Sequence, residues 1–542
     1  MKKMPVLIFA FIFAAAFMLV SCGGDDNGPQ AVVEKDPLEN IDIGPIDDNL
    51  VKYPWPTGMT KFTNVAMAAG GQRIDLYSVR ANNTYNFNVN AERLCDQIPV
   101  AMFDMKEGTI DVVIGVSAVY NQTGSSTVAV AELKDVIIRP LSSNITPTVN
   151  GNIIRFSLTE PGKYSVEYNN VPTRPRNALL IFANEYEDFS AIEESPTAAI
   201  ITKVEDFNSI KGGTTVLVME PGVYVIDFAI ALGRDVTLYL KPGAVVRGKV
   251  DMIGSGSKIV GRGIIDGSHL RDHITLIDGT VILIEGHERN NLEIRGITLF
   301  DPNAWGIQMK AVSGLIIDNL KIVSSRCNSD GISLQSSENI TITNSFVRSW
   351  DDSVVVKNYA TTGYSNNILV KDCILWTDLA QCMEIGMETN KGELDDPRIH
   401  DVTFEDILIF HAMHKPVISI HNADNAAIYD ILFKNITVEN YQPSGWNYLI
   451  DFTNLRGATL GSAEWTTVEE RGSISGVTVE NVWVLSGKTP GARFDSRQGG
   501  SITDITIKDV FFGETKTKLS APPDGFGNPP NPNDGSITIT WQ

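Results

Sequence analysis

Cysteine and histidine are scarce in this chain of 542 residues, which holds 5 cysteines and 7 histidines. No two cysteines stand at CxxC spacing, and no histidine pair follows a cysteine pair as in a zinc site. We therefore expect no metal site and no cofactor. Apart from Cys22, the cysteines are Cys95, Cys327, Cys373 and Cys382. Their spacing leaves open whether any two of them form a disulfide.

Positive charge is also in short supply, because 44 lysines and arginines face 65 aspartates and glutamates, a formal net charge of −21 at pH 7. A surface of this sign repels phosphates and anionic lipids, so neither nucleic acid nor an anionic membrane surface is expected as a partner. The charge also argues against a polyanionic substrate, although one basic groove could outweigh it.

After the first 22 residues the chain has no long apolar run. That first segment joins the basic start MKK to the apolar run PVLIFAFIFAAAFMLV and ends in LVSC. The run is too short for a good membrane-spanning helix and is typical of an export signal. LVSC resembles a bacterial lipobox, in which Cys22 becomes the lipid-modified first residue. The following GGDDN resembles the acidic signal that sends lipoproteins of Bacteroidetes-type bacteria to the cell surface.

We therefore expect an exported protein attached to the outer membrane only through a lipid anchor; a plain secretory signal is the alternative. Residues 23–57 are rich in Asp, Pro, Asn and Gly and predict a flexible tether.

Helix-period segments are missing from residues 58–185, where short alternating runs such as RIDLYSV, TIDVVIGV and IIRFSLT are separated by turn residues. This pattern predicts a small antiparallel β-sandwich. Such a domain could bind sugar or brace its neighbour, and we favour bracing.

From about residue 200 a repeat replaces this pattern. Each unit is an apolar strand, a polar corner and a second strand, at offsets of 23 to 46 residues. Constant strands with variable insertions are typical of a solenoid. A leucine-rich repeat would need a Leu/Asn consensus, and a propeller would need four strands per period of about 40 residues. We predict a right-handed parallel β-helix over 186–515, followed by an irregular tail over 516–542 in which ITITW is one candidate strand. The units are NLEIRGITLF, GLIIDNLKIV, NITITNSFVR, NILVKDCILW, DVTFEDILIF, DILFKNITVE, GVTVENVWVL and DITIKDVFFG.

Three aspartates lie within this repeat, in RCNSDGISLQSSENITITNSFVRSWDDSVVVK. Asp330 precedes Asp351 by 21 residues, and Asp352 follows directly. The residues between them read as the strands GISLQ and ITITNSFVRS joined by a turn. Since this separation is about one coil, we expect the carboxyl groups to stack on one face. Solvated turns are the plainer interpretation of NSDG and WDDS. Clustered carboxylates, however, repel one another and are typical of a site that performs chemistry.

The segments LKPGAVVRGKV and IVGRGIIDGS, followed by NSDG and DD, resemble the first coils and the NTDG and DD motifs of β-helical glycoside hydrolases of the polygalacturonase-like superfamily. The likeness covers about 200–440, and the preceding sandwich is similar to the layout of β-helical dextranases. This resemblance implies inverting hydrolysis, with Asp351 as general acid and with Asp330 and Asp352 positioning and deprotonating water. Crowding by neighbouring carboxylates would raise the pKa of the acid and keep it protonated near neutrality.

Two motifs of polygalacturonases are altered. Gln381 stands where the histidine of their GHG motif would fall, and Ser419-Ile420-His421 replaces their RIK motif. The arginine that best suits a uronate carboxylate is thus absent at its expected place. We therefore expect a neutral polysaccharide or oligosaccharide as the substrate rather than galacturonan.

Several residues around the aspartates are candidates for substrate contact. The alternatives to substrate contact are a solvated Lys357, a pKa-tuning or corner role for Glu384 and a structural role for His421. For Trp350, core packing is the alternative to sugar stacking. Because Trp305 lies one coil earlier, its ring could also stack on sugar. The candidates are Asn328, Lys357, Gln381, Glu384, His421 and Trp305.

Two other classes of protein remain open at this level. A β-helical polysaccharide lyase would need a base and usually Ca²⁺, which clustered acids could bind. A surface adhesin would bind glycan without cleaving it. A monomer is expected, while the sugar, the linkage and endo or exo action are left open.

Overall fold

The computed structural model shows a chain that is almost entirely β-structure. In the part of the chain it describes, helical turns are limited to α1 (Ser190–Glu193) and the 3₁₀ turns Leu141–Ser143 and Val204–Ser209. No helix in that part is long and apolar enough to cross a membrane. Cys22 and Cys95, and with them the predicted lipidation site, lie outside the described residues. These residues are 36–81, 96–122, 126–270, 281–358, 363–390, 394–445, 448–454, 471–496, 499–520 and 537–542.

Two small sheets form the first part of the described chain. One has the order β1-β5-β13-β12-β9 with β4 also on β5, and the other has the order β10-β11-β6-β2-β3. Pairing is antiparallel except between β5 and β13. Phe103 and Ile181 of the first sheet share a core with Ile114 and Phe156 of the second, which confirms the β-sandwich. The strands are β1 (Leu50–Lys52), β2 (Val65–Ala69), β3 (Gln72–Ile74), β4 (Tyr77–Ala81), β5 (Asp96–Met105), β6 (Ile110–Val116), β9 (Ile137–Arg139), β10 (Thr148–Asn150), β11 (Ile153–Leu158), β12 (Gly162–Glu167) and β13 (Ala178–Glu185), with a separate pair β7 (Ala118–Tyr120) and β8 (Thr127–Ala129).

The predicted tether over 23–57 is wrong for its second half. Leu50–Lys52 pairs with β5, and the side chains of Leu38, Leu50 and Tyr53 are at most 7% exposed. These apolar side chains hold the segment on the sandwich despite its Pro- and Asp-rich composition.

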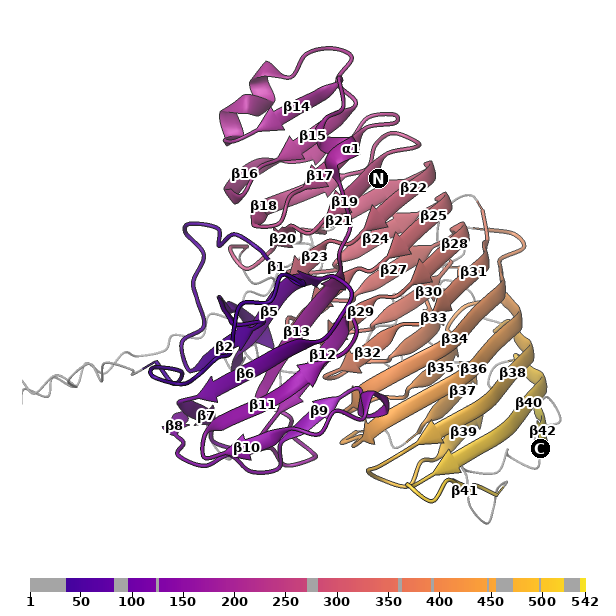
Figure 1. Ribbon diagram of the computed structural model, residues 1–542. Coiled ribbons are helices and arrows are strands. Elements are labelled where there is room, and N and C mark those ends of the chain that lie inside the picture. The colour runs from indigo at the N-terminus through magenta and orange to yellow at the C-terminus, as the bar shows by residue number, and fades with distance from the viewer. Residues whose placement is uncertain are drawn as a thin grey trace, which may run out of the picture. The chain divides into compact units, whose positions relative to one another are not determined.

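The remaining strands form one stack of coils (Figure 1), paired in parallel except for β41, which is antiparallel to β40. From β21 to β31 each strand pairs with the third strand after it, so a coil contains three strands, and the prediction of a parallel β-helix is confirmed. The repeat units of the sequence cover two strands of each coil; the third follows them. The tail is not irregular throughout, because the candidate strand ITITW forms β42 on β40.

The strands of the stack are β14 (Ala198–Ile201), β15 (Val216–Met219), β16 (Gly222–Ala231), β17 (Thr237–Leu240), β18 (Ala244–Asp251), β19 (Lys258–Gly261), β20 (Ile264–Asp266), β21 (Ile284–His287), β22 (Asn290–Arg295), β23 (Thr298–Phe300), β24 (Ile307–Lys310), β25 (Ser313–Asp318), β26 (Lys321–Val323), β27 (Ile332–Gln335), β28 (Glu338–Thr343), β29 (Phe346–Ser349), β30 (Val354–Lys357), β31 (Ser365–Lys371), β32 (Ile374–Thr377), β33 (Met383–Met387), β34 (Arg398–Ala412), β35 (Ile418–Asn422), β36 (Ala427–Tyr441), β37 (Ile450–Asn454), β38 (Ser473–Val484), β39 (Ala492–Asp495), β40 (Ser501–Phe512), β41 (Thr517–Lys518) and β42 (Ile537–Trp541).

The polar corners of the repeat have a backbone cause. The first residue of each unit and the corner residue between its strands adopt positive φ, a region in which Asn, Asp and Gly are the least strained. Corner side chains also bond from coil to coil, as Asn435 Nδ2 does to Asp406 Oδ1 at 2.8 Å. The first residues of the units are Asn291, Gly314, Asn339, Asn367, Asp401, Asp430, Gly476 and Asp504.

The sandwich and the β-helix share a second apolar core. Tyr77 and Phe182 of the sandwich lie 5.8 Å and 5.3 Å, between ring centroids, from Phe300 and Phe346 of the helix. This packing supports a bracing role for the sandwich.

Candidate active site

The three aspartates lie in successive bends of the coil, each just before the third strand. Asp330 precedes β27, and Asp351 and Asp352 precede β30, which pairs with β27 in parallel. The amide of Gly331 donates to the carbonyl of Asp352 at 2.8 Å, so these bends stack directly on one another. The two neighbouring aspartates lie in a bend rather than within a strand, as the expected stacking requires.

Gly331 allows this close stacking. A Cβ atom at this position would lie 2.4 Å from Cγ1 of Val347 and 2.5 Å from the carbonyl oxygen of Ser353. Both contacts are shorter than van der Waals distance, so a side chain would push the two bends apart. The glycine of the NSDG motif therefore maintains the spacing of the aspartates.

Burial and mutual repulsion favour protonation of the cluster. Asp330 is 3% exposed, and burial raises its pKa well above the usual range. The ammonium group of Lys357 lowers the pKa of Asp330, whereas the charges of Asp351 and Asp352 raise it. Burial also raises the pKa of Asp352 to about 7, with contributions from Asp351 and Glu384. Asp330 and Asp352 are thus the members of the cluster on which burial and neighbouring carboxylates favour protonation near neutral pH.

Lys357 is part of this cluster and is not a solvated lysine. Its side chain is 7% exposed, and Nζ lies 3.7 Å from Oδ2 of Asp330 and 3.2 Å from Oε2 of Glu388. The same ammonium group lies 5.0 Å from the ring centroid of half-buried Trp305. Lys357 therefore bridges two carboxylates against an aromatic face. Glu388 was not predicted; its only signal is its place in the coil after Lys357.

Gln381 contacts the cluster through its backbone. Its amide donates to Oδ1 of Asp352 at 3.1 Å, and its side-chain nitrogen lies 3.4 Å from Nδ1 of His421. Its Oε1 is buried and accepts no hydrogen bond from the described residues. Half-buried Asn328 takes positive φ in the bend before Asp330.

Glu384 and His421, two of the candidates for substrate contact, are buried, and the charge of Glu384 contributes to the raised pKa of Asp352 after burial and Asp351. Each is 1% exposed. Nδ1 of His421 lies 2.8 Å from Oε1 of Glu384, and Nε2 lies 3.1 Å from Oδ2 of Asp451. Ser419 donates a hydrogen bond to the other oxygen of Glu384. The polar atoms of both residues therefore find their partners inside the protein.

This network fixes the charge of His421. Burial alone would lower the pKa of His421, but the carboxylates of Glu384 and Asp451 outweigh it and raise the pKa to about 10. Arg493 completes the ladder with two bonds to Asp451, at 2.8 Å and 2.6 Å. Burial would raise the pKa of Asp451, yet His421 and Arg493 lower it.

Asp451 and Arg493 were missed by sequence analysis, although the repeat contained a signal for them. The strand register places Glu384, Ser419, Asp451 and Arg493 in one column across β33, β35, β37 and β39. The sequence units omit this third strand, so the column was not visible in them.

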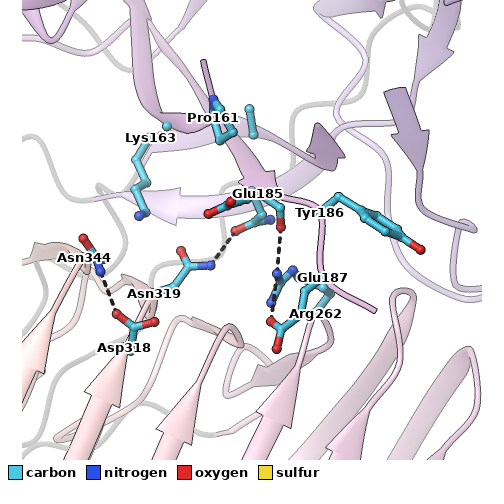
Figure 2. Close-up of a pocket in the computed structure, with 12 residues that line it drawn as sticks. Pro161, Lys163, Glu185, Tyr186, Glu187, Arg262, Asp318, Asn319 and Asn344 are labelled. Carbon is cyan, nitrogen blue, oxygen red and sulfur yellow. Dashed lines mark hydrogen bonds and ion pairs between the residues drawn. The ribbon is translucent and has the colours of Figure 1, made fainter. Parts of the chain in front are cut away.

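A polar cleft of about 480 Å³ lies elsewhere, between β12–β13 of the sandwich and the coils of the helix (Figure 2). Its lining includes Lys163, Arg262, Asp318 and Asn319 but none of the three aspartates. Figure 2 shows Arg262 joined to Glu185, the last residue of β13, and to Glu187. The stacked carboxyl groups with raised pKa values lie in the aspartate cluster and not in this cleft.

The arrangement suits acid–base chemistry. Over the described ranges, no three His, Cys, Asp or Glu side chains are placed to hold a metal ion. Cys327, Cys373 and Cys382 are free thiols. Trp350 is 4% exposed, which favours core packing over sugar stacking for its ring.

The chain is similar to known carbohydrate-active proteins. Residues 257–522 match the family described as glycosyl hydrolases family 28. Over 446 residues the chain is 22% identical to an isopullulanase from Aspergillus niger, covering 71% of this chain and 74% of that protein. Dex49A from Penicillium minioluteum superposes with a TM-score of 0.64 at 14% identity, covering 92% of this chain and 97% of Dex49A. At that identity the likeness to Dex49A speaks for the fold alone. The matched range 257–522 contains all three aspartates.

Proposed function

Because this protein is a β-helical glycoside hydrolase of the polygalacturonase-like type that acts on polysaccharide, we propose that it cleaves a neutral glucan with inversion of configuration. The observation that carries the proposal is the stacking of Asp330 on the bend of Asp351 and Asp352, in surroundings that raise carboxyl pKa values.

In this mechanism Asp351 donates its proton to the glycosidic oxygen as the bond to the anomeric carbon breaks. Asp330 and Asp352 hold a water molecule on the other face of the sugar, and one of these two carboxylates takes a proton from the water as it attacks the anomeric carbon. A pKa of about 7 suits Asp352 to a base that works near neutrality. Oδ2 of Asp330 is buried and accepts no hydrogen bond from the described residues, so it can accept one from water. Protons are shared within such a cluster, and its titration belongs to the group rather than to one residue.

The preference for a neutral substrate is supported by the pairing of two cations near the cluster, while a third, Lys415, acts electrostatically on Asp352. Lys357 is paired with Asp330 and Glu388, and Arg493 with Asp451. Ser419, at the place of the uronate-binding arginine, is buried. Because one relative is named isopullulanase, pullulan, a neutral glucan, is the first substrate to test.

We also propose that the mature protein is a monomer that begins at acylated Cys22 and is displayed at the cell surface. The lipobox-like LVSC and the acidic GGDDN that follows it support this location. The expected attachment to the membrane is through the lipid alone.

The function is tested by incubating the protein with pullulan, dextran, galactans, algal galactans and polygalacturonate and measuring new reducing ends. We expect release from a neutral glycan, pullulan or dextran first, and little or none from polygalacturonate; Asp351→Asn is the matched inactive control. Efficient depolymerisation of polygalacturonate would contradict the substrate assignment and indicate that Lys415, whose charge acts on Asp352, binds the uronate carboxylate. An unsaturated product whose formation is blocked by a chelator would instead indicate a lyase. Binding of glycan without release of reducing ends would indicate an adhesin.

A further inference from the structure

A chain of ion pairs runs from the sandwich to the bend that carries Asp330. Arg80 on β4 of the sandwich places Nε 2.7 Å from Oδ2 of Asp301, in the β-helix. Nη2 of Arg326 lies 2.9 Å from the same oxygen. The side chains of Asp301 and Arg326 are at most 1% exposed, and that of Arg80 is 21% exposed. One buried carboxylate thus joins two guanidinium groups from different parts of the protein.

Arg326 is the first residue of the bend that ends at Asp330. Its carbonyl oxygen accepts hydrogen bonds from the hydroxyl of Ser329, at 2.5 Å, and from the amide of Ser329, at 3.1 Å. The hydroxyl of Ser324 donates to the carbonyl of Ser329 at 2.9 Å. The bend is closed on itself, so a shift of Arg326 is passed on to Asp330.

The bend is also attached to Asp301 at a second point. The hydroxyl of Ser325 donates to Oδ1 of Asp301 at 3.1 Å. Both oxygens of the Asp301 carboxylate therefore contact the chain at the start of the bend, Oδ1 at Ser325 and Oδ2 at Arg326. Arg80 contacts Oδ2 from the sandwich. Loss of Arg80 would leave Oδ2 of Asp301 with Arg326 as its ion-pair partner and let the carboxylate shift towards it. Arg326 keeps its bonds to the carbonyls of Gly267, Ser268 and Leu270, so the expected displacement of the bend is small.

We propose that Arg80 is a positioning residue for Asp330, so that the sandwich supplies part of the support of the active site in addition to bracing the helix. The inference rests on the proposed function of Asp330. Displacement of a catalytic group by about 1 Å can reduce turnover on the order of 100-fold. Charged pairs with little solvent access are suited to such a role, because their geometry is more restricted than that of exposed pairs.

Docking of the two parts does not depend on Arg80. The shared apolar core holds them together, as do the ion pairs of Arg139 with Glu439, at 2.7 Å, and of Arg262 with Asp104, at 3.0 Å. Arg139 is therefore a matched control: it also joins sandwich to helix through a buried pair, but its partners are Glu167 and Glu439 and not the bend.

The test compares Arg80→Ala, Arg80→Lys and Arg139→Ala in the full chain. For Arg80→Ala we expect kcat on the best glycan to fall by about 10-fold or more with a smaller change in KM. Amide hydrogen exchange should rise over 326–331. Arg80→Lys should recover part of kcat, and Arg139→Ala should lower thermal stability while keeping kcat per folded molecule and exchange over 326–331.

Parental kcat together with parental exchange over 326–331 in Arg80→Ala would overturn the proposal, as would an equal loss of kcat in Arg139→Ala. Should Arg80→Ala fail to fold, Arg80→Gln is measured by the same criteria. If the parent cleaves no glycan, the proposed hydrolysis fails, whereas the exchange experiment still decides whether Arg80 holds the bend.

Discussion

Replacing His421 by glutamine removes a cation that lies between two buried carboxylates. Nδ1 and Nε2 of His421 lie 2.8 Å from Glu384 and 3.1 Å from Asp451, and the ring is 1% exposed. The pKa of His421 rises from an ordinary 6.5 to about 10. Each pKa unit corresponds to about 1.4 kcal/mol, so the protonated ring contributes on the order of 5 kcal/mol to the free energy of unfolding.

The sign of the pH dependence follows from the direction of this shift. A pKa raised in the folded state gives a contribution that is complete below pH 6.5 and is lost as the pH rises towards 10. Across that window the folded chain holds one more proton at His421 than the unfolded chain. The free energy of unfolding should therefore fall by about 1.4 kcal/mol per pH unit through this group. His421→Gln should lack that component and be less stable at pH 7 by about 3–5 kcal/mol, the cost typical of a broken buried ion pair.

The assay is urea unfolding of parent and variant between pH 6 and 9.5, followed by tryptophan fluorescence. Because other groups titrate in this range, the quantity that matters is the difference between parent and variant at each pH, which should shrink as the pH rises. His411→Gln is the matched control. His411 is also 1% exposed and lies 2.8 Å from Glu167, but burial lowers its pKa to about 4, so it stays neutral above pH 6.5. A difference for His421→Gln that stays constant with pH would refute a protonated His421.

Two further predictions concern the chemistry and the location. Asp351→Asn should lower turnover of a natural glycan by roughly 10²–10⁴-fold while keeping substrate binding, because it removes the proton donor; near-normal activity would move the acid to another carboxyl. Asp330→Asn and Asp352→Asn should also be severe, and since amides remove repulsion, calorimetry should show stability equal to or above that of the parent. Cys22→Ala should move the protein from the membrane fraction to the soluble fraction, and a variant that stays as firmly bound as the parent would show that LVSC is not a lipobox.

The sequence was sufficient to predict the coil and the stacking of the aspartates for a physical reason. In a solenoid, a residue one coil later lies one strand spacing away, so the separation of Asp330 from Asp351 in sequence predicts their arrangement in space. The Asn, Asp and Gly corners have a local backbone cause, and local causes can be read from sequence.

The partners of the site could not be read in this way. In the sequence, Glu384 and His421 look like surface residues of a strand. Only the strand register, which brings Asp451 and Arg493 into line with Glu384, shows that the carboxylates of this group are paired with cations. Arg80 is 221 residues from Asp301 along the chain, and no periodicity relates the sandwich to the helix. The Pro- and Asp-rich segment after residue 35 was expected to be free, because composition does not reveal that Leu38 and Tyr53 find an apolar surface.

The stereochemistry of the first product tests the central claim most directly. Parent enzyme is mixed with the best neutral glycan, and proton NMR follows the anomeric signals before mutarotation equilibrates them. Direct attack of water held by Asp330 and Asp352 predicts that the first anomer to appear has the configuration opposite to that of the cleaved bond. A first product that retains the configuration would require a covalent intermediate and would contradict the mechanism.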